Sequence, residues 1–101
     1  MDFQVTLNDR FVSDLKEIVD YLTSHADKEI ASRLGNELLN RALALGVSPF
    51  IGQPVKQRPG VRKIIHHPYL IYYHVDVYRQ TVKVLRVCHG ARDLKMLRLH
   101  I

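Results

Sequence analysis

The residues that could do chemistry in this chain lie mostly in its second half. Lys63 and Arg86 lie in strand-like segments, and Arg92 closely follows the last of these segments. A cluster of such cations can stabilise the charge that develops when a phosphodiester is cleaved, and RNA supplies its own 2′-hydroxyl nucleophile. The sequence therefore offers a candidate site for phosphoryl transfer. A simpler interpretation is that Arg92 and Asp93 pair with neighbouring side chains and hold the C-terminal turn in place.

Other reactive side chains do not form a known kind of site. His66 and His67 are adjacent, so on a strand they point to opposite faces and do not bind one metal ion together. Cys88 ends an apolar segment, which is typical of a buried thiol rather than a nucleophile. The five glycines are too scattered for a phosphate-binding loop. We therefore expect no metal and no cofactor.

The net charge of +5 is unevenly divided along the chain. Residues 1–50 contain five basic and eight acidic side chains, a net charge of −3. Residues 51–101 contain ten basic and two acidic ones, a net charge of +8. This asymmetry suggests a cationic face for a polyanion or for an acidic protein partner. A solvated surface with a chance excess of cations is the alternative.

The length and composition predict one small domain. A chain of 101 residues is long enough for a single hydrophobic core, so we expect one domain over residues 1–101. The single cysteine excludes an intramolecular disulfide and fits a reducing, cytoplasmic setting. No apolar run is long enough to span a membrane, and no signal peptide is visible. We therefore expect a cytoplasmic protein that does not associate with membranes.

The first half predicts a strand followed by two helices. Apolar and polar residues alternate over Phe3–Leu7, which indicates a short strand. Asn8 or Asp9 then caps a helix, and Asp27 caps a second helix that Gly46 and Pro49 end. Each helix has one apolar stripe: Phe11, Leu15, Ile18, Val19 and Leu22 in the first, and Ile30, Leu34, Leu38, Leu39 and Leu43 in the second. In the first helix, Asp14, Lys16, Glu17 and Asp20 are expected to face water.

The second half predicts the sheet on which these helices pack. A loop over Gln53–Gly60 leads into strands at Val61–His66, Tyr69–Val75 and Thr81–Cys88, with a turn at Val77–Gln80. The order β-α-α-β-β-β predicts an α+β two-layer sandwich, a helical hairpin on a small, mainly antiparallel sheet. Because unpaired charges are not buried, we expect the strands to project their cations away from the helices, namely Arg62, Lys63, His66, His74, Lys83 and Arg86.

Several short motifs together resemble the RelE/ParE toxin superfamily of bacterial type II toxin–antitoxin systems, often labelled plasmid stabilisation proteins. The motifs occur in family order and spacing over nearly the whole chain: Ser48-Pro49, Gly52–Val55, Gly60–Arg62, Pro68–Tyr73 and Leu85–Asp93. The resemblance implies a RelE-like fold and two possible activities. One branch cleaves mRNA on the ribosome, and the other inhibits DNA gyrase.

The resemblance favours the gyrase-directed, ParE-like branch. Lys63 and Arg92 match basic positions of the ribonuclease branch, but Leu70 replaces an expected arginine and Arg98 stands where the catalytic tyrosine would fall. Leucine does not stabilise a phosphorane, and an arginine does not act as a phenolic acid or base. The alternative is a ribosome-dependent mRNA endoribonuclease using Lys63, Arg86 and Arg92. A further alternative is a degenerate, non-toxic subunit that binds an antitoxin.

The resemblance also implies a cognate antitoxin, and with it a toxin–antitoxin hetero-oligomer. Antitoxins of this superfamily lay an extended or helical segment across the toxin, in grooves between the helical hairpin and the sheet. Tyr72 and Tyr73 are adjacent and face opposite sides of the strand, so at least one is expected in the core. The candidate contacts with antitoxin or target are Arg62, Lys63, Tyr72, Tyr73, Arg86, His89, Arg92, Asp93 and Arg98.

Overall fold

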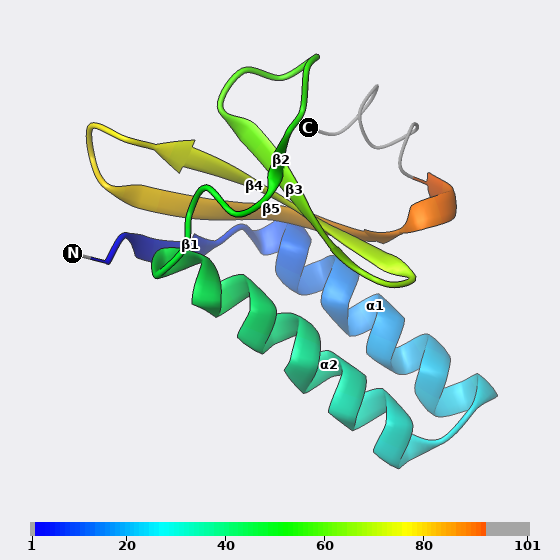
Figure 1. Cartoon of the computed structure of the whole chain (residues 1–101). Coiled ribbons are helices and arrows are strands. Elements are labelled where there is room, and N and C mark those ends of the chain that lie inside the picture. Colours follow the sequence, from blue (N-terminus) through cyan, green and yellow to red (C-terminus); the bar gives the residue numbers. More distant parts are fainter. Residues whose placement is uncertain (1, 93–101) are drawn as a thin grey trace.

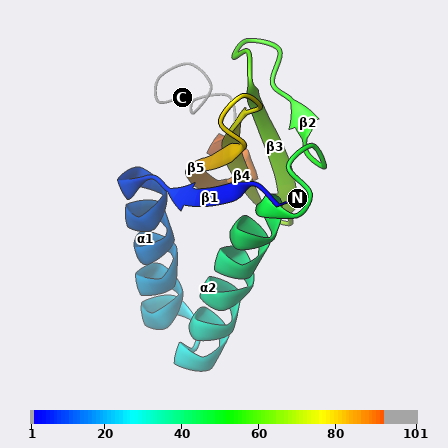
Figure 2. The same ribbon diagram turned by 90° about the vertical axis from the view of Figure 1, so that its left-hand side faces the viewer.

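The computed structural model describes residues 2–92 and has the α+β architecture that the sequence predicts (Figure 1). A five-stranded sheet has the strand order β1-β5-β4-β3-β2. The two long helices lie together on one side of this sheet (Figures 1 and 2). The elements are β1 (Gln4–Leu7), α1 (Asp9–His25), α2 (Lys28–Leu43), η1 (Ala44–Gly46), β2 (Gln53–Pro54), β3 (Val61–His66), β4 (Tyr69–Asp76), β5 (Thr81–His89) and η2 (Gly90–Arg92).

Side-chain caps begin both helices. Of the two residues expected to cap α1, it is Asn8 that accepts a hydrogen bond from the Arg10 N–H, at 3.1 Å. Asp27 caps α2 by accepting from the Glu29 N–H at 3.0 Å. These bonds satisfy amides that have no partner inside the helix, so each helix begins next to its capping residue.

The last three strands form the antiparallel meander that their short connections predict. The first strand completes the sheet from the other end of the chain. It pairs in parallel with β5, from Gln4 opposite Thr81 to Leu7 opposite Val84. The Asn8 N–H extends the pairing by donating to the carbonyl of Val84 at 2.9 Å. In the chain, the helical hairpin connects β1 to β2, which lie at opposite edges of the sheet.

The expected loop over residues 53–60 contains a short strand, so that prediction was wrong in part. Gln53 pairs with Lys63 and Pro54 pairs with Arg62. Proline lacks the N–H of a ladder and for this reason indicates a loop, but it is tolerated in an edge strand. β2 lies at the edge of the sheet. On the outer side of an edge strand there is no ladder of hydrogen bonds, so the missing N–H of Pro54 is tolerated there.

The sheet buries apolar side chains on both faces. On the face covered by α1 and α2, the helix face, the core includes Phe11, Leu38, Ile71 and Tyr73. The opposite face, the far face, carries a second buried cluster of Val55, Val61, Leu70, Tyr72 and Cys88. Among the described residues, no helix is long and apolar enough to cross a membrane.

Candidate functional site

The pleat of β3 divides the cations that the sequence placed on one surface. Arg62 lies opposite Tyr73, which belongs to the helix-face core, whereas Lys63 lies opposite Tyr72 of the far-face cluster. Successive side chains of a strand point to opposite faces, so these two neighbours cannot form one site. His66 also lies on the helix side, where its Nε2 is 3.2 Å from Glu37 Oε2. The expectation that all six strand cations face away from the helices was therefore wrong.

Arg86 is directed toward the helices as well, because it has an acidic partner there. Its Nε donates to Asp14 Oδ2 at 2.7 Å, and its Nη2 donates to Asp14 Oδ1 at 2.9 Å. The same carboxylate accepts from the Val87 N–H at 3.2 Å. Both side chains are only 12% exposed, so Asp14 does not face water as its position among polar residues suggested. The hydrogen bond from Arg86 to Asp14 raises the pKa of Arg86, which remains charged.

A groove of about 740 Å³ opens beside this ion pair, between α1 and the C-terminal end of β5. We call it the α1–β5 groove. The expected contact residue His89 lies here together with Arg86. One further nitrogen of Arg86, Nη1, is buried and has no hydrogen-bond partner among the described residues. The groove is lined by Asp14, Glu17, Ile18, Tyr21, Pro68, Tyr69, Arg86, Val87, Cys88, His89 and Ala91.

Three ring-bearing side chains line the α1–β5 groove, namely Tyr21, Tyr69 and His89. On the helix side, the Tyr21 ring stacks on His25 with 4.2 Å between centroids. On the sheet side, Tyr69 meets His89 edge to face at 5.8 Å. Burial raises the pKa of Tyr69, and the nearby Tyr21 adds to this effect. Rings with a polar edge provide contact area that suits a peptide segment. Tyr21 is accessible for such a contact, because 61% of this residue is exposed.

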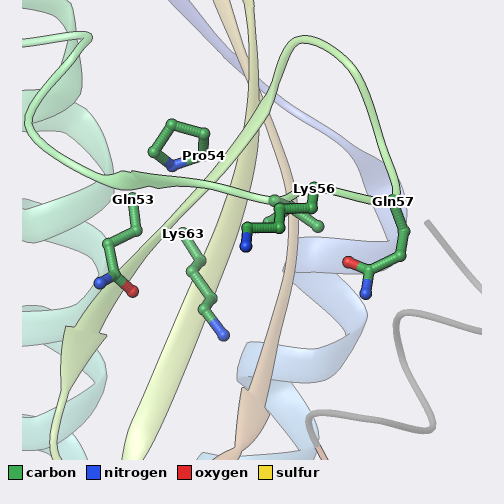
Figure 3. Close-up of a pocket in the computed structure, with 6 residues that line it drawn as sticks. Gln53, Pro54, Lys56, Gln57 and Lys63 are labelled. Atoms are coloured by element: carbon green, nitrogen blue, oxygen red, sulfur yellow. The ribbon is translucent and has the colours of Figure 1, made fainter.

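Lys63 lines a second, smaller hollow of about 370 Å³ beside β2, at the edge of the sheet. Lys56 and the amides of Gln53 and Gln57 also line it, and Figure 3 shows these four side chains pointing to the same side. Pro54 and Val55 complete the lining, which contains no acidic residue. Four such groups form a hollow that suits an anionic group.

The two adjacent tyrosines are both fully buried, on opposite faces of β4. The Tyr73 hydroxyl accepts a hydrogen bond from the Gly52 N–H at 2.9 Å. Arg62 holds the same loop, since its Nη1 donates to the carbonyls of Gly52 at 2.7 Å and Phe50 at 3.2 Å. Burial raises the pKa of Tyr73, although the bond from Gly52 and the charge of Arg62 oppose the shift. In this arrangement Tyr72, Tyr73 and Arg62 support the sheet and the loop before β2.

The remaining candidate residues lie at the end of the described chain or beyond it. Arg92 ends η2, directly after the groove residues His89 and Ala91. Asp93 and Arg98 lie outside the described residues. Within residues 2–92, no group of three histidine, cysteine or acidic side chains could hold a metal ion.

Comparison with known protein families identifies the chain's relatives. The family model for the ParE toxin of the type II toxin–antitoxin system parDE matches residues 5–94. The chain belongs to the ParE toxin family. This match covers both helices, all of the sheet except Gln4, and both hollows, and it agrees with the RelE/ParE resemblance of the sequence motifs. A comparison with curated proteins found no match.

Solved structures show the same fold at low sequence identity. The chromosomal ParDE system from P. aeruginosa has a TM-score of 0.74 at 19% identity, covering 86% of this chain and 95% of that one. The toxin–antitoxin complex RelBE2 from Mycobacterium tuberculosis has a TM-score of 0.68 at 22% identity, covering 88% and 99%. A double mutant of the E. coli toxin RelE in the free state has a TM-score of 0.70 at 16% identity, covering 99% and 94%.

Sequence reasoning missed most residues of the α1–β5 groove. Asp14, Ile18 and Tyr21 are spaced by four and three residues, so they share one face of α1. That spacing was a usable signal for one wall. The other wall, with Tyr69 and His89, is assembled by the pairing of β4 with β5. No local pattern connects the two walls.

Proposed function

We propose that this ParE family member is the toxin of a type II toxin–antitoxin pair, that it inhibits DNA gyrase, and that a cognate antitoxin neutralises it in the cytoplasm. The burial of Leu70 is the observation that carries the choice of gyrase. Leu70 occupies the position where the resemblance to the ribonuclease branch would require an arginine, and it is 8% exposed in the far-face cluster. A cation does not replace it there without losing its hydration.

The α1–β5 groove is the proposed binding site of the antitoxin. Its volume of about 740 Å³ and its ring-bearing walls suit a segment that folds on binding. The bound segment would contact Tyr21 and His89, next to Arg86 in the groove lining. Neutralisation then produces a toxin–antitoxin hetero-oligomer.

The hollow beside Lys63 supports a second candidate function, ribosome-dependent cleavage of mRNA. Lys56 and Lys63 line it without an acidic residue, which suits the phosphodiester backbone of RNA. Under this alternative Lys63 and Arg92 stabilise the transition state. Leu70 weakens this candidate, because it supplies no charge at a position that the resemblance identifies as functional.

Purified chain added to gyrase and plasmid DNA distinguishes the two targets. Gyrase inhibition predicts loss of supercoiling or trapped cleavage, and expression without antitoxin predicts arrested, filamentous cells. Ribonuclease activity instead predicts cuts in ribosome-bound message that disappear in Lys63→Ala and Arg92→Ala variants. Intact supercoiling at a large molar excess of the chain would contradict the gyrase proposal.

The proposed antitoxin-binding site is tested by one variant with a matched control. Tyr21→Ser changes a ring in the groove, and Val12→Ser changes another exposed residue of α1 outside the groove lining. We expect Tyr21→Ser to weaken antitoxin binding by at least about tenfold and Val12→Ser to leave it unchanged. Equal affinities of the two variants would contradict the placement. Normal growth when the wild-type chain is expressed alone would indicate a non-toxic, antitoxin-binding subunit.

A further inference from the structure

Exposed apolar side chains gather at the end of the molecule that carries the N-terminus. They come from two segments, the loop before β2 and the turn between β4 and β5. The most exposed is Tyr78, at 100%, while Ile51 is 68% exposed. We call the set the end surface, and its members are Val47, Phe50, Ile51, Val77 and Tyr78.

The start of β1 joins the two segments of the end surface. The Phe3 N–H donates to the carbonyl of Gly46 at 2.8 Å, and the Phe3 ring meets Phe50 edge to face at 6.0 Å. The next residue, Gln4, donates its N–H to the carbonyl of Gln80 at 3.0 Å. Figure 1 shows both segments at the end of the sheet near the N-terminus, away from the turn between α1 and α2.

Hydrogen bonds hold both segments in place, so the exposed side chains stand on a fixed backbone. In the turn after β4, Asp76 Oδ1 accepts from the Arg79 N–H at 3.1 Å. Arg62 and Tyr73 hold the loop at Gly52. A surface that is already ordered loses less conformational entropy on binding.

The charges around the end surface favour an acidic partner. The Arg62 guanidinium lies 5.2 Å from the centre of the Phe50 ring, and Arg79 extends into solvent with 83% of its side chain exposed. The carboxylate of the same turn, Asp76, is 3.9 Å from the Arg79 Nε. A second copy of this chain would set cations against cations, and its net charge is +5. An apolar centre with tyrosine and arginine is typical of protein interfaces, whereas nucleic acid mainly engages charged surfaces.

We propose that the end surface docks on the cellular target of the toxin, at an apolar pocket rimmed by carboxylates, with Tyr78 as the anchor. This inference rests on the proposed function. β4 begins at Tyr69, in the α1–β5 groove, and ends at Asp76, beside Tyr78. Eight residues of strand span about 25 Å, so an antitoxin segment confined to the groove lies well away from Tyr78. Target binding and antitoxin binding therefore use different ends of β4.

A double variant, Tyr78→Ser with Ile51→Ser, tests this separation. The matched control is Ile30→Ser with Ile65→Ser, which removes two exposed apolar side chains outside the end surface. Thermal unfolding checks that both variants fold. Affinity is measured for the complete gyrase holoenzyme and, separately, for the cognate antitoxin, and growth is followed during expression without antitoxin.

We expect the test variant to lose at least about tenfold in gyrase affinity and to stop arresting growth, with antitoxin affinity kept within about threefold. The control should behave as wild type. Wild-type behaviour of the test variant overturns the proposal, as does a loss confined to antitoxin binding. If wild type arrests growth without binding gyrase, only the gyrase assignment fails. The growth assay with the test variant then decides whether the end surface is needed for toxicity. A wild-type chain that is not toxic overturns both proposals.

Discussion

Asp14 and Arg86 form a bidentate ion pair that joins the middle of α1 to β5, with nitrogen–oxygen distances of 2.7 and 2.9 Å. The pair lies on the wall of the α1–β5 groove. It fixes the distance between the two sides of the groove. The pair therefore contributes both to stability and to the shape of the proposed antitoxin-binding site.

Asp14→Asn should destabilise the protein by about 3 kcal/mol, because Arg86 then keeps a largely buried charge without its partner. Urea denaturation measures the loss. Asp20→Asn changes an exposed carboxylate of the same helix and should stay within about 0.5 kcal/mol of wild type. Equal stabilities of the two variants would show that the pair contributes nothing net.

Tyr73→Phe should cost about 1–3 kcal/mol, because it leaves the buried N–H of Gly52 without an acceptor. The loop before β2 should also open more often, since Arg62 would then hold it alone. Hydrogen exchange at the Gly52 amide measures this opening directly. Unchanged protection of that amide would contradict the role given to the hydroxyl.

Alkaline pH should destabilise the protein through Tyr69 and Tyr73. Burial raises the pKa of both side chains above the ordinary 10.0, so the unfolded chain loses these protons first. Their contribution is complete below pH 10.0 and is lost as the pH rises through their folded pKa values. Urea midpoints measured from about pH 8 to about pH 11 should fall less steeply for Tyr73→Phe than for wild type. Tyr78→Phe, at a fully exposed residue, should follow the wild-type profile.

Leu70→Arg should destabilise the fold by at least about 3 kcal/mol, because it places a charge in the buried far-face cluster. Ile65→Arg is the matched control, since Ile65 pairs with Leu70 across the sheet but is 60% exposed. Thermal unfolding compares the two. A Leu70→Arg protein as stable as Ile65→Arg would contradict the argument that burial excludes a cation at this position.

The elements of this fold were predictable because their signals are local. The apolar stripes marked both helices, Asn8 and Asp27 marked their beginnings, and the apolar and β-branched runs marked β3 to β5. The parallel pairing of β1 with β5 was not predicted, because no periodicity states which strand lies beside which. The same holds for Asp14 and Arg86, which are far apart in the chain and polar in type.

The orientation of the strand cations is a different case, because the signal was present in the sequence. Arg62 and Lys63 are adjacent, and the alternation that separates His66 from His67 separates them as well. The argument that unpaired charges avoid the core holds, but partners for Arg86 and His66 exist on the helices. Lys63 points to the far face, as expected.

The pairing of β1 with β5 has a consequence for biosynthesis. Gln4 leaves the ribosome well before its partner Thr81, which follows it by 77 positions in the chain. Until β5 emerges, the first strand has no neighbour and the helical hairpin lacks the strand that joins it to the rest of the sheet. Contacts between distant parts of a chain form slowly. The sheet is therefore completed only after β5 has left the ribosome, and every surface to which β5 contributes first exists at that moment.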